Sequence, residues 1–417
     1  MHSAFRDRNI VLGVTGSIAA YKACELASRL VEYGANVTAV LTRSASQMIG
    51  PASLTAITGR PVITGLFDES QNPEIEHISV ATNAHLFLIA PATANILAKA
   101  ARGAADDWLS TALLATRAPI LFAPAMNTNM YTHPATQVNL DILRARGCRF
   151  VGPESGRLAC RTIGPGRLAE TQSILEAVIP LTNDRHDLAG RQVVLTSGPT
   201  HEPIDPVRFI GNRSSGKMGR AIAMELLARG ATVSAVVGPH SEPMPKGVRV
   251  IPVQTAAEMA ETAVNLAQEA DVFIGCAAVA DYRAESANPT KRKRDGKGLL
   301  LKLVENPDVI GLVGAVKREG QVVVGFAAET DQLLANARQK LEKKHLDLIV
   351  ANEVGVPDSG FGTDTLRAAI LDGNGAAPEL RLLPKEKLAE ELADRISTLL
   401  STARSGAKGR IAREVNN

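Results

Sequence analysis

The sequence predicts an α/β protein made of two doubly wound, Rossmann-like domains, and three observations support this prediction. Short β-branched strands alternate with Ala- and Leu-rich helices along most of the chain, which is the pattern of parallel α/β sheets. The length of 417 residues, 45% of them hydrophobic, is enough for two or three domains with real cores. The third observation is that two distant segments of the chain share one plan.

Those two segments begin alike and end alike. "NIVLGVTGS" (9–17) and "QVVLTSGPT" (192–200) each combine a strand with a Gly-containing turn. The helices that follow them lead into "GANVTAVLT" (34–42) and "GATVSAVVG" (230–238), which nearly coincide. The polar, turn-rich stretch 180–192 separates the two copies. We therefore predict two domains, residues 1–185 and 186–417.

Further strands of the same kind follow in each half. They are expected within 84–94, 118–127, 270–282, 321–330 and 346–354. Each of them runs into a polar turn, and in doubly wound sheets ligands bind beyond the carboxyl ends of the strands. We therefore look for functional residues in these turns. The residues from Ser401 onward are expected to form a frayed polar tail.

Composition excludes several classes of partner. Lys and Arg number 46 against 43 Asp and Glu, which gives a net charge of only +3, and aromatic residues are 3% of the chain. These values argue against a nucleic-acid or membrane partner. The four cysteines lie far apart without a C-x-x-C motif, which argues against zinc or iron–sulfur ligation. No signal peptide or long apolar run is present, so a soluble, cytoplasmic protein is expected.

In the first half, glycine, hydroxyl and amide residues follow four strands. The turn after the first strand can hold a phosphate with backbone N–H groups, although it is not a full G-x-G-x-x-G. Taken singly, these turns would also fit helix caps and core packing. Together, at one edge of a sheet, they favour a ligand. The candidate residues are Gly16, Ser17, Ile18, Thr42, Thr93, Asn95, Met126 and Asn127.

Three motifs in this half resemble those of the flavin-containing cysteine decarboxylases. They are "PATAN" (91–95), "PAMNTNM" (124–130) and "ACRTIGPGR" (159–167). His77, in "EIEHISVA", matches the histidine of that family, although alone it would read as an exposed residue at a helix start. The resemblance implies that the turn residues bind FMN. Oxidation of the substrate thiol to a thioaldehyde then provides the electron sink that the loss of CO2 requires.

The resemblance also assigns catalytic roles. His77 would act as the base or orienting group, and Asn127 would hold the substrate carboxylate. Cys160 would return a proton to the enethiolate, from a mobile loop that closes over the substrate and excludes water. The sequence has Arg161 where the family more often has glycine. The other cysteines, Cys24, Cys148 and Cys276, are expected to be structural.

The second half contains a long glycine- and serine-rich turn, "GPTHEPIDPVRFIGNRSSGKMG" (198–219). It is not a Walker A motif, because Met218 follows Lys217, and no G-x-G-x-x-G follows the opening strand. A phosphate cradle and a dinucleotide site both remain open on these residues alone. The basic run "KRKRDGKG" (291–298) suits either a triphosphate contact or a solvated loop.

This turn, with "AAVADYR" (277–283), "NPDV" (306–309) and "VGFAAET" (324–330), resembles phosphopantothenate–cysteine ligase. That family activates 4′-phosphopantothenate with CTP as an acyl-cytidylate, with Mg²⁺ on the triphosphate, and the cysteine amine then displaces CMP. The resemblance implies that Asn212 contacts the substrate and that Lys291 is needed to form the acyl-cytidylate. It leaves the metal ligands unassigned. The nucleotide pocket would comprise Asp281, Lys291, Asn306, Pro307, Asp308, Val309, Ile310, Phe326, Lys340 and Lys344.

Together the two resemblances cover residues 8–400 and imply a bifunctional enzyme of coenzyme A biosynthesis, expected to be a homo-oligomer acting on small molecules. One alternative is a flavin-containing peptide-cysteine decarboxylase or prenyl-flavin synthase fused to a nucleotide-binding domain. Another is a regulator without catalytic activity, built on the decarboxylase fold. Cys160 and the ligase motifs argue against the first alternative, and the lack of long acidic extensions argues against the second.

Overall fold

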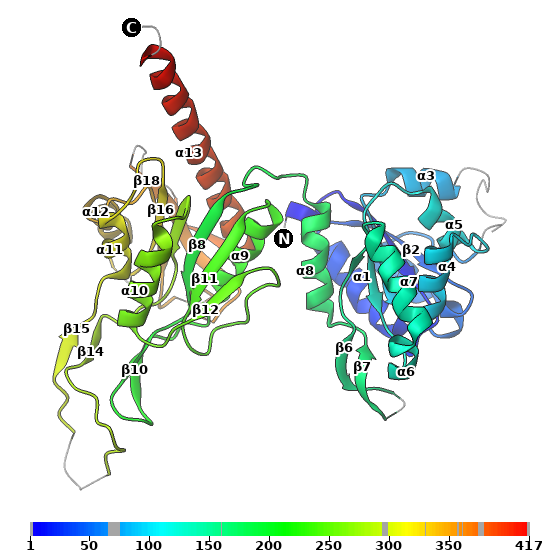
Figure 1. The fold of residues 1–417 in the computed structure, drawn as a ribbon, viewed down its shortest axis with the longest axis horizontal. Helices are drawn as coiled ribbons and strands as arrows, with labels where there is room; N and C mark the ends of the chain where they lie inside the picture. The colour runs from blue at the N-terminus through cyan, green and yellow to red at the C-terminus, as the bar shows by residue number, and fades with distance from the viewer. Residues whose placement is uncertain are drawn as a thin grey trace. The chain divides into compact units, whose positions relative to one another are not determined.

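The computed structural model describes residues 3–65, 76–159, 161–293, 299–329, 331–356, 358–360, 362–373 and 379–414. The chain divides into two compact units, Met1–Asp184 and Arg185–Asn417 (Figure 1). We call them the first and the second unit.

The first unit is built on a parallel sheet of order β2-β1-β3-β4-β5. The strand order reverses between β1 and β3, which is the switch point where doubly wound sheets bind ligands. The strands are β1 (Asn9–Val14), β2 (Asn36–Leu41), β3 (Leu86–Ala92), β4 (Ile120–Pro124) and β5 (Arg149–Phe150). A separate antiparallel hairpin joins β6 (Glu154–Arg157) to β7 (Ile163–Arg167).

Helices surround this sheet, and every residue of its central strand β3 is buried. Such burial on both faces explains why β3 reads as a continuous apolar run. The helical elements are η1 (Ser3–Phe5), η2 (Ile18–Tyr21), α1 (Lys22–Glu32), η3 (Ala45–Gln47), α2 (Pro51–Thr58), α3 (Glu76–Asn83), α4 (Ala94–Arg102), α5 (Trp108–Ala115), α6 (Thr128–Thr132), α7 (Pro134–Ala145) and α8 (Thr171–Thr182).

The second unit has a larger sheet of order β12-β11-β8-β13-β16-β17-β18-β19. The strands from β12 to β17 are parallel, whereas β18 and β19 are antiparallel to their neighbours. The order reverses between β8 and β13. The strands are β8 (Gln192–Ser197), β11 (Thr232–Val237), β12 (Arg249–Pro252), β13 (Val272–Gly275), β16 (Val322–Glu329), β17 (Leu348–Glu353), β18 (Thr365–Asp372) and β19 (Arg381–Pro384).

Two short ribbons stand apart from this sheet, one of β9 (His201–Pro203) with β10 (Phe209–Gly211) and one of β14 (Tyr282–Ala284) with β15 (Leu303–Glu305). Apolar residues of α9 (Lys217–Ala228) and α13 (Lys385–Glu414) share one core with the sheet. Those of α10 (Ala256–Ala267), α11 (Val309–Ala315) and α12 (Leu333–Lys343) form a second core. The two cores cover opposite faces of the sheet, so the prediction of two doubly wound α/β domains is confirmed.

The carboxyl-terminal segment differs from the expected frayed tail. Helix α13 continues from Lys385 to Glu414 (Figure 1). Its first half is held by the core, because Leu388, Leu392 and Ile396 are at most 1% exposed. Once a helix is anchored in this way, each further residue adds a hydrogen bond without a new nucleation cost. Among the described residues, no helix has the length and apolar character needed to cross a membrane.

Candidate active sites

In the first unit, the predicted ligand residues follow the carboxyl ends of four adjacent strands. Gly16, Ser17 and Ile18 follow β1, and Thr42 follows β2. Thr93 and Asn95 follow β3, while Met126 and Asn127 follow β4. Since β2, β1, β3 and β4 are neighbours in a parallel sheet, these residues share one edge of it. The structure therefore brings the turns together around the switch point between β1 and β3.

Gly16 is needed where the turns after β1 and β2 meet. A Cβ atom at Gly16 would lie 2.4 Å from the Cβ of Ser44, a distance that real side chains do not reach. Ser17 caps η2 by accepting a hydrogen bond from the Ala19 N–H at 3.4 Å. The Thr42 hydroxyl accepts from the Ala45 N–H at 3.3 Å. Each hydroxyl thus stabilises the turn to which it belongs.

Thr15, a residue that is not among the predicted ligand residues, links the carboxyl ends of β1 and β3. Its buried hydroxyl donates to the Pro91 carbonyl at 2.7 Å and accepts from the Thr93 N–H at 3.0 Å. The Thr93 hydroxyl in turn caps α4 by accepting from the Ile96 N–H, and Asn95 is exposed in the first turn of this helix. A threonine at a strand end is a weak sequence signal, because only the packing of β1 against β3 gives it two partners.

The turn after β4 is braced by the β6–β7 hairpin. The Met126 N–H donates to the Gly166 carbonyl at 2.9 Å, and Gly166 has a φ of +144°. The Asn127 side chain caps α6, since its oxygen accepts from the Asn129 N–H at 2.8 Å. The segment that carries Cys160 was expected to be a loop, but much of it is this antiparallel hairpin. Cross-strand hydrogen bonds between 154–157 and 163–167 account for the difference.

Two predicted catalytic residues have no described side chain. Cys160 lies outside the described residues, between β6 and β7. His77 belongs to α3, but its side chain is likewise outside the described part of the chain. The described part of the first-unit site therefore consists of the turn residues and Thr15.

In the second unit, the loop after β13 is the meeting point of the predicted site. The Asn212 amide donates to the carbonyls of Ala278 at 3.3 Å and Val279 at 2.9 Å. The Asn306 amide donates to the Ala280 carbonyl at 2.8 Å, and its N–H donates to the Asp281 carbonyl at 2.8 Å. Asn212, Asp281 and Asn306 are therefore joined through residues 278–281, at the carboxyl end of a central strand.

The segment 306–310 connects this loop to α12. The Ile310 side chain fills the space beside Gly275 on β13, where an added Cβ would lie 2.8 Å from it. Pro307 precedes the N-cap residue Asp308, and Val309 is buried. Asp308 also pairs with Lys344 at 2.8 Å. The structure thus brings two predicted nucleotide residues into direct contact.

The remaining predicted lysines occupy different surroundings. Lys340 pairs with Glu329 at 2.6 Å. The four-residue spacing of Lys340 and Lys344 would place both on one face of a helix, but α12 ends at Lys343 and Lys344 is its C-cap residue. Lys291 is exposed. Its neighbour Arg292 is anchored, since its N–H donates to Asp205 at 3.3 Å and its carbonyl accepts from Arg208 at 2.8 Å. Hydrogen bonds from the Arg208 side chain hold the pKa of Asp205 well below its usual value.

A cavity opens at the carboxyl ends of β13, β16 and β17, beside the start of α9, and we call it the α9 cavity. Phe326 is the member of the predicted nucleotide set that lines it. Of the described lining residues, two are lysines and none carries a carboxylate. The lining consists of 214–219, 276–278, 326–328, Asn352, Gly360, Gly362, Leu366 and Lys385.

Sequence reasoning missed Lys385, Lys217 and Asn352 as cavity residues. Lys385 is 5% exposed, and burial together with the charge of Lys217 lowers its pKa. The Asn352 Oδ1 is buried without a hydrogen-bond partner. Cys276 also faces the cavity, and burial raises the pKa of its thiol to about 12. Neither Lys385 nor Asn352 belongs to a recognisable motif, so no local signal pointed to them.

The residues present suit the cofactors that the sequence implies. Backbone N–H groups, hydroxyls and amides at the first-unit edge are the donors and acceptors that a phosphorylated, polar-edged flavin requires. The cationic α9 cavity suits a polyphosphate. Within the described ranges, no three His, Cys, Asp or Glu side chains group as a metal site would require, so protein ligands for Mg²⁺ are unassigned.

Two family descriptions match the chain. "Flavoprotein" matches residues 2–183, and "DNA/pantothenate metabolism flavoprotein C-terminal domain" matches residues 188–400. Among solved structures, the C-terminal domain of a coenzyme A biosynthesis bifunctional protein CoaBC is 34% identical, covers 52% of this chain and 99% of its own, and gives a TM-score of 0.45. A PPC decarboxylase mutant complexed with pantothenoylaminoethenethiol is 32% identical, covers 42% and 97%, and gives a TM-score of 0.38.

Full-length relatives span both units. The coenzyme A biosynthesis bifunctional protein CoaBC of Escherichia coli K12 is 46% identical over 397 residues, which are 94% of this chain and 97% of that protein. The protein of the same name from Bacillus subtilis 168 is 42% identical over 401 residues, again 94% and 97%. Neither an unrelated fusion nor a regulator would be similar throughout to a bifunctional enzyme. The chain belongs to the CoaBC family, the bifunctional phosphopantothenoylcysteine decarboxylases and synthetases of coenzyme A biosynthesis.

Proposed function

We propose that the second unit couples 4′-phosphopantothenate to cysteine with CTP, and that the first unit decarboxylates the resulting 4′-phosphopantothenoylcysteine to 4′-phosphopantetheine with FMN. The observation that carries this assignment is the 46% identity with a coenzyme A biosynthesis bifunctional protein along both units. The gathering of polar turns at each sheet's switch point supports it. The corresponding domains are residues 1–185 and 186–417.

For the ligase step, CTP and phosphopantothenate would bind at the α9 cavity and the adjoining 276–281 loop. A carboxylate oxygen of phosphopantothenate attacks the α-phosphorus of CTP, the bond to the bridging oxygen breaks, and pyrophosphate leaves with the electron pair. The cysteine amine then attacks the acyl carbon and displaces CMP. Asn212, whose amide donates to the carbonyls of Ala278 and Val279, would contact the acyl group. Lys291 would add charge from the loop anchored at Asp205.

The remaining nucleotide contacts are proposed for Asp281, Asn306–Ile310, Phe326, Lys340 and Lys344. Their support is the chain of contacts that runs from residues 278–281 to the Asp308–Lys344 pair. Mg²⁺ would neutralise the triphosphate and the departing pyrophosphate.

For the decarboxylase step, the edge residues Gly16–Ile18, Thr42, Thr93, Asn95 and Met126 would hold FMN. When bound, the flavin supplies reversible two-electron oxidation of the substrate thiol, which makes loss of CO2 possible. Asn127 would bind the substrate carboxylate, and His77 would orient the substrate or take its proton. Cys160 would hold the proton that the enethiolate needs. The β6–β7 hairpin is hydrogen-bonded through Gly166 to Met126, the residue before Asn127.

We further propose that the enzyme is a cytoplasmic homo-oligomer that acts on these small molecules and on neither nucleic acid nor membranes. The balanced charge of +3 supports the last point. Sedimentation analysis of the full chain tests the assembly.

The function is tested by incubating the full chain with 4′-phosphopantothenate, cysteine, CTP and Mg²⁺ and measuring the product mass. Phosphopantetheine is the expected product. Accumulation of phosphopantothenoylcysteine would contradict the role of the first unit. If the protein is yellow but releases no pyrophosphate from CTP, the role of the second unit is contradicted. That result would favour a flavoprotein that acts on a different substrate.

A further inference from the structure

Two helices of the second unit begin at the α9 cavity, and each begins with a lysine. Helix α9 starts at Lys217 and α13 starts at Lys385, and both residues line the cavity. The amino-terminal end of a helix carries partial positive charge, so a cation in the first turn is unfavourable. The fold therefore concentrates two like charges and two helix ends of the same sign in one place. Such an arrangement requires compensation by negative charge.

Protein groups provide that compensation only in part. Lys217 donates to the Gly362 carbonyl at 2.9 Å and pairs with Asp364 at 2.7 Å, but the Asp364 side chain is 85% exposed. Lys385 donates to the carbonyls of Gly360 and Thr363. Asp364 and Glu386 act on Lys385 through their charges, and Lys217 opposes its protonation. Hydrogen bonds to neutral carbonyls leave a buried ammonium with an unbalanced charge.

The other polar groups of the cavity also point to a ligand. Ser214 and Ser215 precede α9, and the Asn352 Oδ1 is a buried acceptor without a partner. Among the lining residues that the structure describes, none carries a carboxylate that would neutralise the lysines. By contrast, Lys340 and Lys344, expected to hold the nucleotide, already pair with Glu329 and Asp308. At the cavity, the described hydrogen bonds of Lys385 go to carbonyls, and the ion pair of Lys217 is with the largely exposed Asp364. Compensation is therefore weakest at Lys385 and only partial at Lys217.

We propose that Lys217 and Lys385 bind the β- and γ-phosphates of the nucleotide, between the first turns of α9 and α13. This inference rests on the proposed CTP-dependent ligation. When the bond between the α-phosphorus and the bridging oxygen breaks, the electron pair goes to pyrophosphate, and the two ammonium groups neutralise the charge that develops there. Lys217 exchanges the exposed Asp364 for the phosphate, whereas Lys385 keeps its carbonyl partners.

The test compares ligands that differ in phosphate number. Lys385→Met and Lys217→Met are titrated with CTP, CMP and inorganic tripolyphosphate in the presence of Mg²⁺, using isothermal calorimetry on the full chain. We expect CTP and tripolyphosphate to bind about 10- to 100-fold more weakly, as for loss of a hydrogen bond to a charged group. CMP should keep its affinity within about twofold. Lys385→Arg should recover part of the loss for CTP.

Lys387→Met is the matched control, because Lys387 lies on the same helix and pairs with Glu390 at 2.8 Å. It should bind all three ligands as the unmodified chain does. An equal loss of affinity for CTP and CMP would overturn the proposal and show that the lysines only shape the cavity wall. Unchanged affinities for CTP and tripolyphosphate would overturn it as well. If Lys385→Met does not fold, the partly exposed Lys217 carries the test. Failure of the unmodified chain to release pyrophosphate would instead refute the ligation itself, while tripolyphosphate binding would still test the lysine pair.

Discussion

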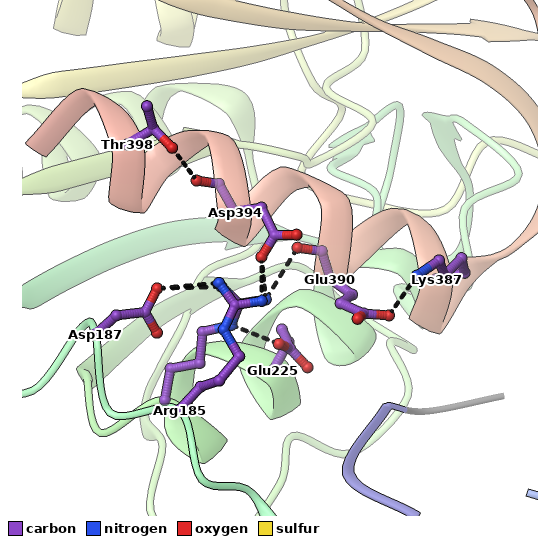
Figure 2. Close-up of polar contacts among 8 residues, drawn as sticks. Arg185, Asp187, Glu225, Lys387, Glu390, Asp394 and Thr398 are labelled. Carbon is purple, nitrogen blue, oxygen red and sulfur yellow. Dashed lines mark hydrogen bonds and ion pairs between the residues drawn. The ribbon is translucent and has the colours of Figure 1, made fainter. Parts of the chain in front are cut away.

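The Nη2 atom of Arg229 lies 2.7 Å from the Oδ1 of Asp394, which joins the end of α9 to the first half of α13. Arg229 is fully buried, and its Nε lies 2.6 Å from Glu225. Figure 2 shows Asp187, Glu225, Glu390 and Asp394 gathered at this point from three parts of the second unit. Both helices that are joined here begin at the α9 cavity. The ion cluster therefore helps to fix the placement of α9 relative to α13.

Replacing Arg229 tests how much this cluster stabilises the second unit. Arg229→Met should lower the free energy of unfolding of that unit by about 3–5 kcal/mol, because the buried Glu225 carboxylate loses the cation with which it pairs. Urea unfolding measures the change. The control is Arg395→Met, since Arg395 forms an exposed pair with Asp372 at 3.1 Å and should cost less than about 1 kcal/mol. Equal losses in the two variants would contradict the account.

Because Gly16 and Ser44 lie so close together, we expect that a substitution of Gly16 impairs flavin binding and that a second substitution, at Ser44, restores it. Gly16→Ala places a Cβ 2.4 Å from the Ser44 Cβ, so the turns after β1 and β2 must separate, at a cost of about 1–3 kcal/mol. We expect the variant to lose its flavin on gel filtration, as read from visible absorbance. Adding Ser44→Gly removes the colliding atom and should restore retention. A double variant that stays as colourless as the single one would exclude steric collision as the cause.

The described cysteines should be unreactive. Burial raises the pKa of the Cys24, Cys148 and Cys276 thiols, that of Cys276 to about 12. Since the thiolate is the nucleophile, brief treatment with iodoacetamide at pH 8 should leave all three unmodified. Peptide mass spectrometry of the native and the urea-unfolded protein measures this, and the unfolded sample, in which all should react, is the control. Rapid alkylation of native Cys276 would contradict the prediction.

His201 should make the second unit less stable in mild acid. Its ring stacks on Phe209 with centroids 3.6 Å apart and lies 5.5 Å from the His240 ring. Burial, followed by the charge of His240, lowers its pKa, while Glu202 opposes this. The unfolded chain then binds more protons than the folded one, so this contribution to stability is complete above about pH 6.5 and is lost as the pH falls toward the lowered pKa.

The corresponding measurement is urea unfolding at pH 7.5 and pH 5.5. His201→Gln should reduce the loss of stability between these two values, because the glutamine cannot take up the proton. His133→Gln is the control, since His133 is an exposed residue of the first unit. An unchanged pH dependence in His201→Gln would assign the effect to other groups.

Two substitutions should separate the proposed reactions. Lys291→Ala should abolish pyrophosphate release while leaving decarboxylation of supplied phosphopantothenoylcysteine intact, because Lys291 belongs to the second unit. Cys160→Ser should still release CO2 yet stall before the final reduction, with an oxidised enethiol as product. Coupled pyrophosphate and mass measurements follow both steps. Full turnover by Cys160→Ser, or loss of both activities in Lys291→Ala, would remove the assigned roles.

The sequence by itself determined the fold class and the place of the sites. The buried strands read as apolar runs, the helices between them as Ala- and Leu-rich segments, and both signals are local. The turns after β1, β3, β4 and β13 could also be found, because a strand end is visible in sequence and parallel strands must end at one edge. Cap residues such as Thr93 and Asn127 occupy those turns, as their residue types suggest.

Only the tertiary structure decided which charged groups meet. Lys217 and Lys385 start two helices far apart in sequence, and the packing of α9 against α13 brings both to one cavity. In the same way, Lys344 pairs with Asp308, and the fully buried Arg229 gathers acids from three segments. The physical reason is that hydrophobic periodicity is a property of neighbouring residues, whereas burial and charge pairing depend on which distant surfaces pack together. Lys385 reads as an exposed helix residue in the sequence, and it becomes a buried cation only when distant segments, among them the carbonyls of Gly360 and Thr363, pack around it.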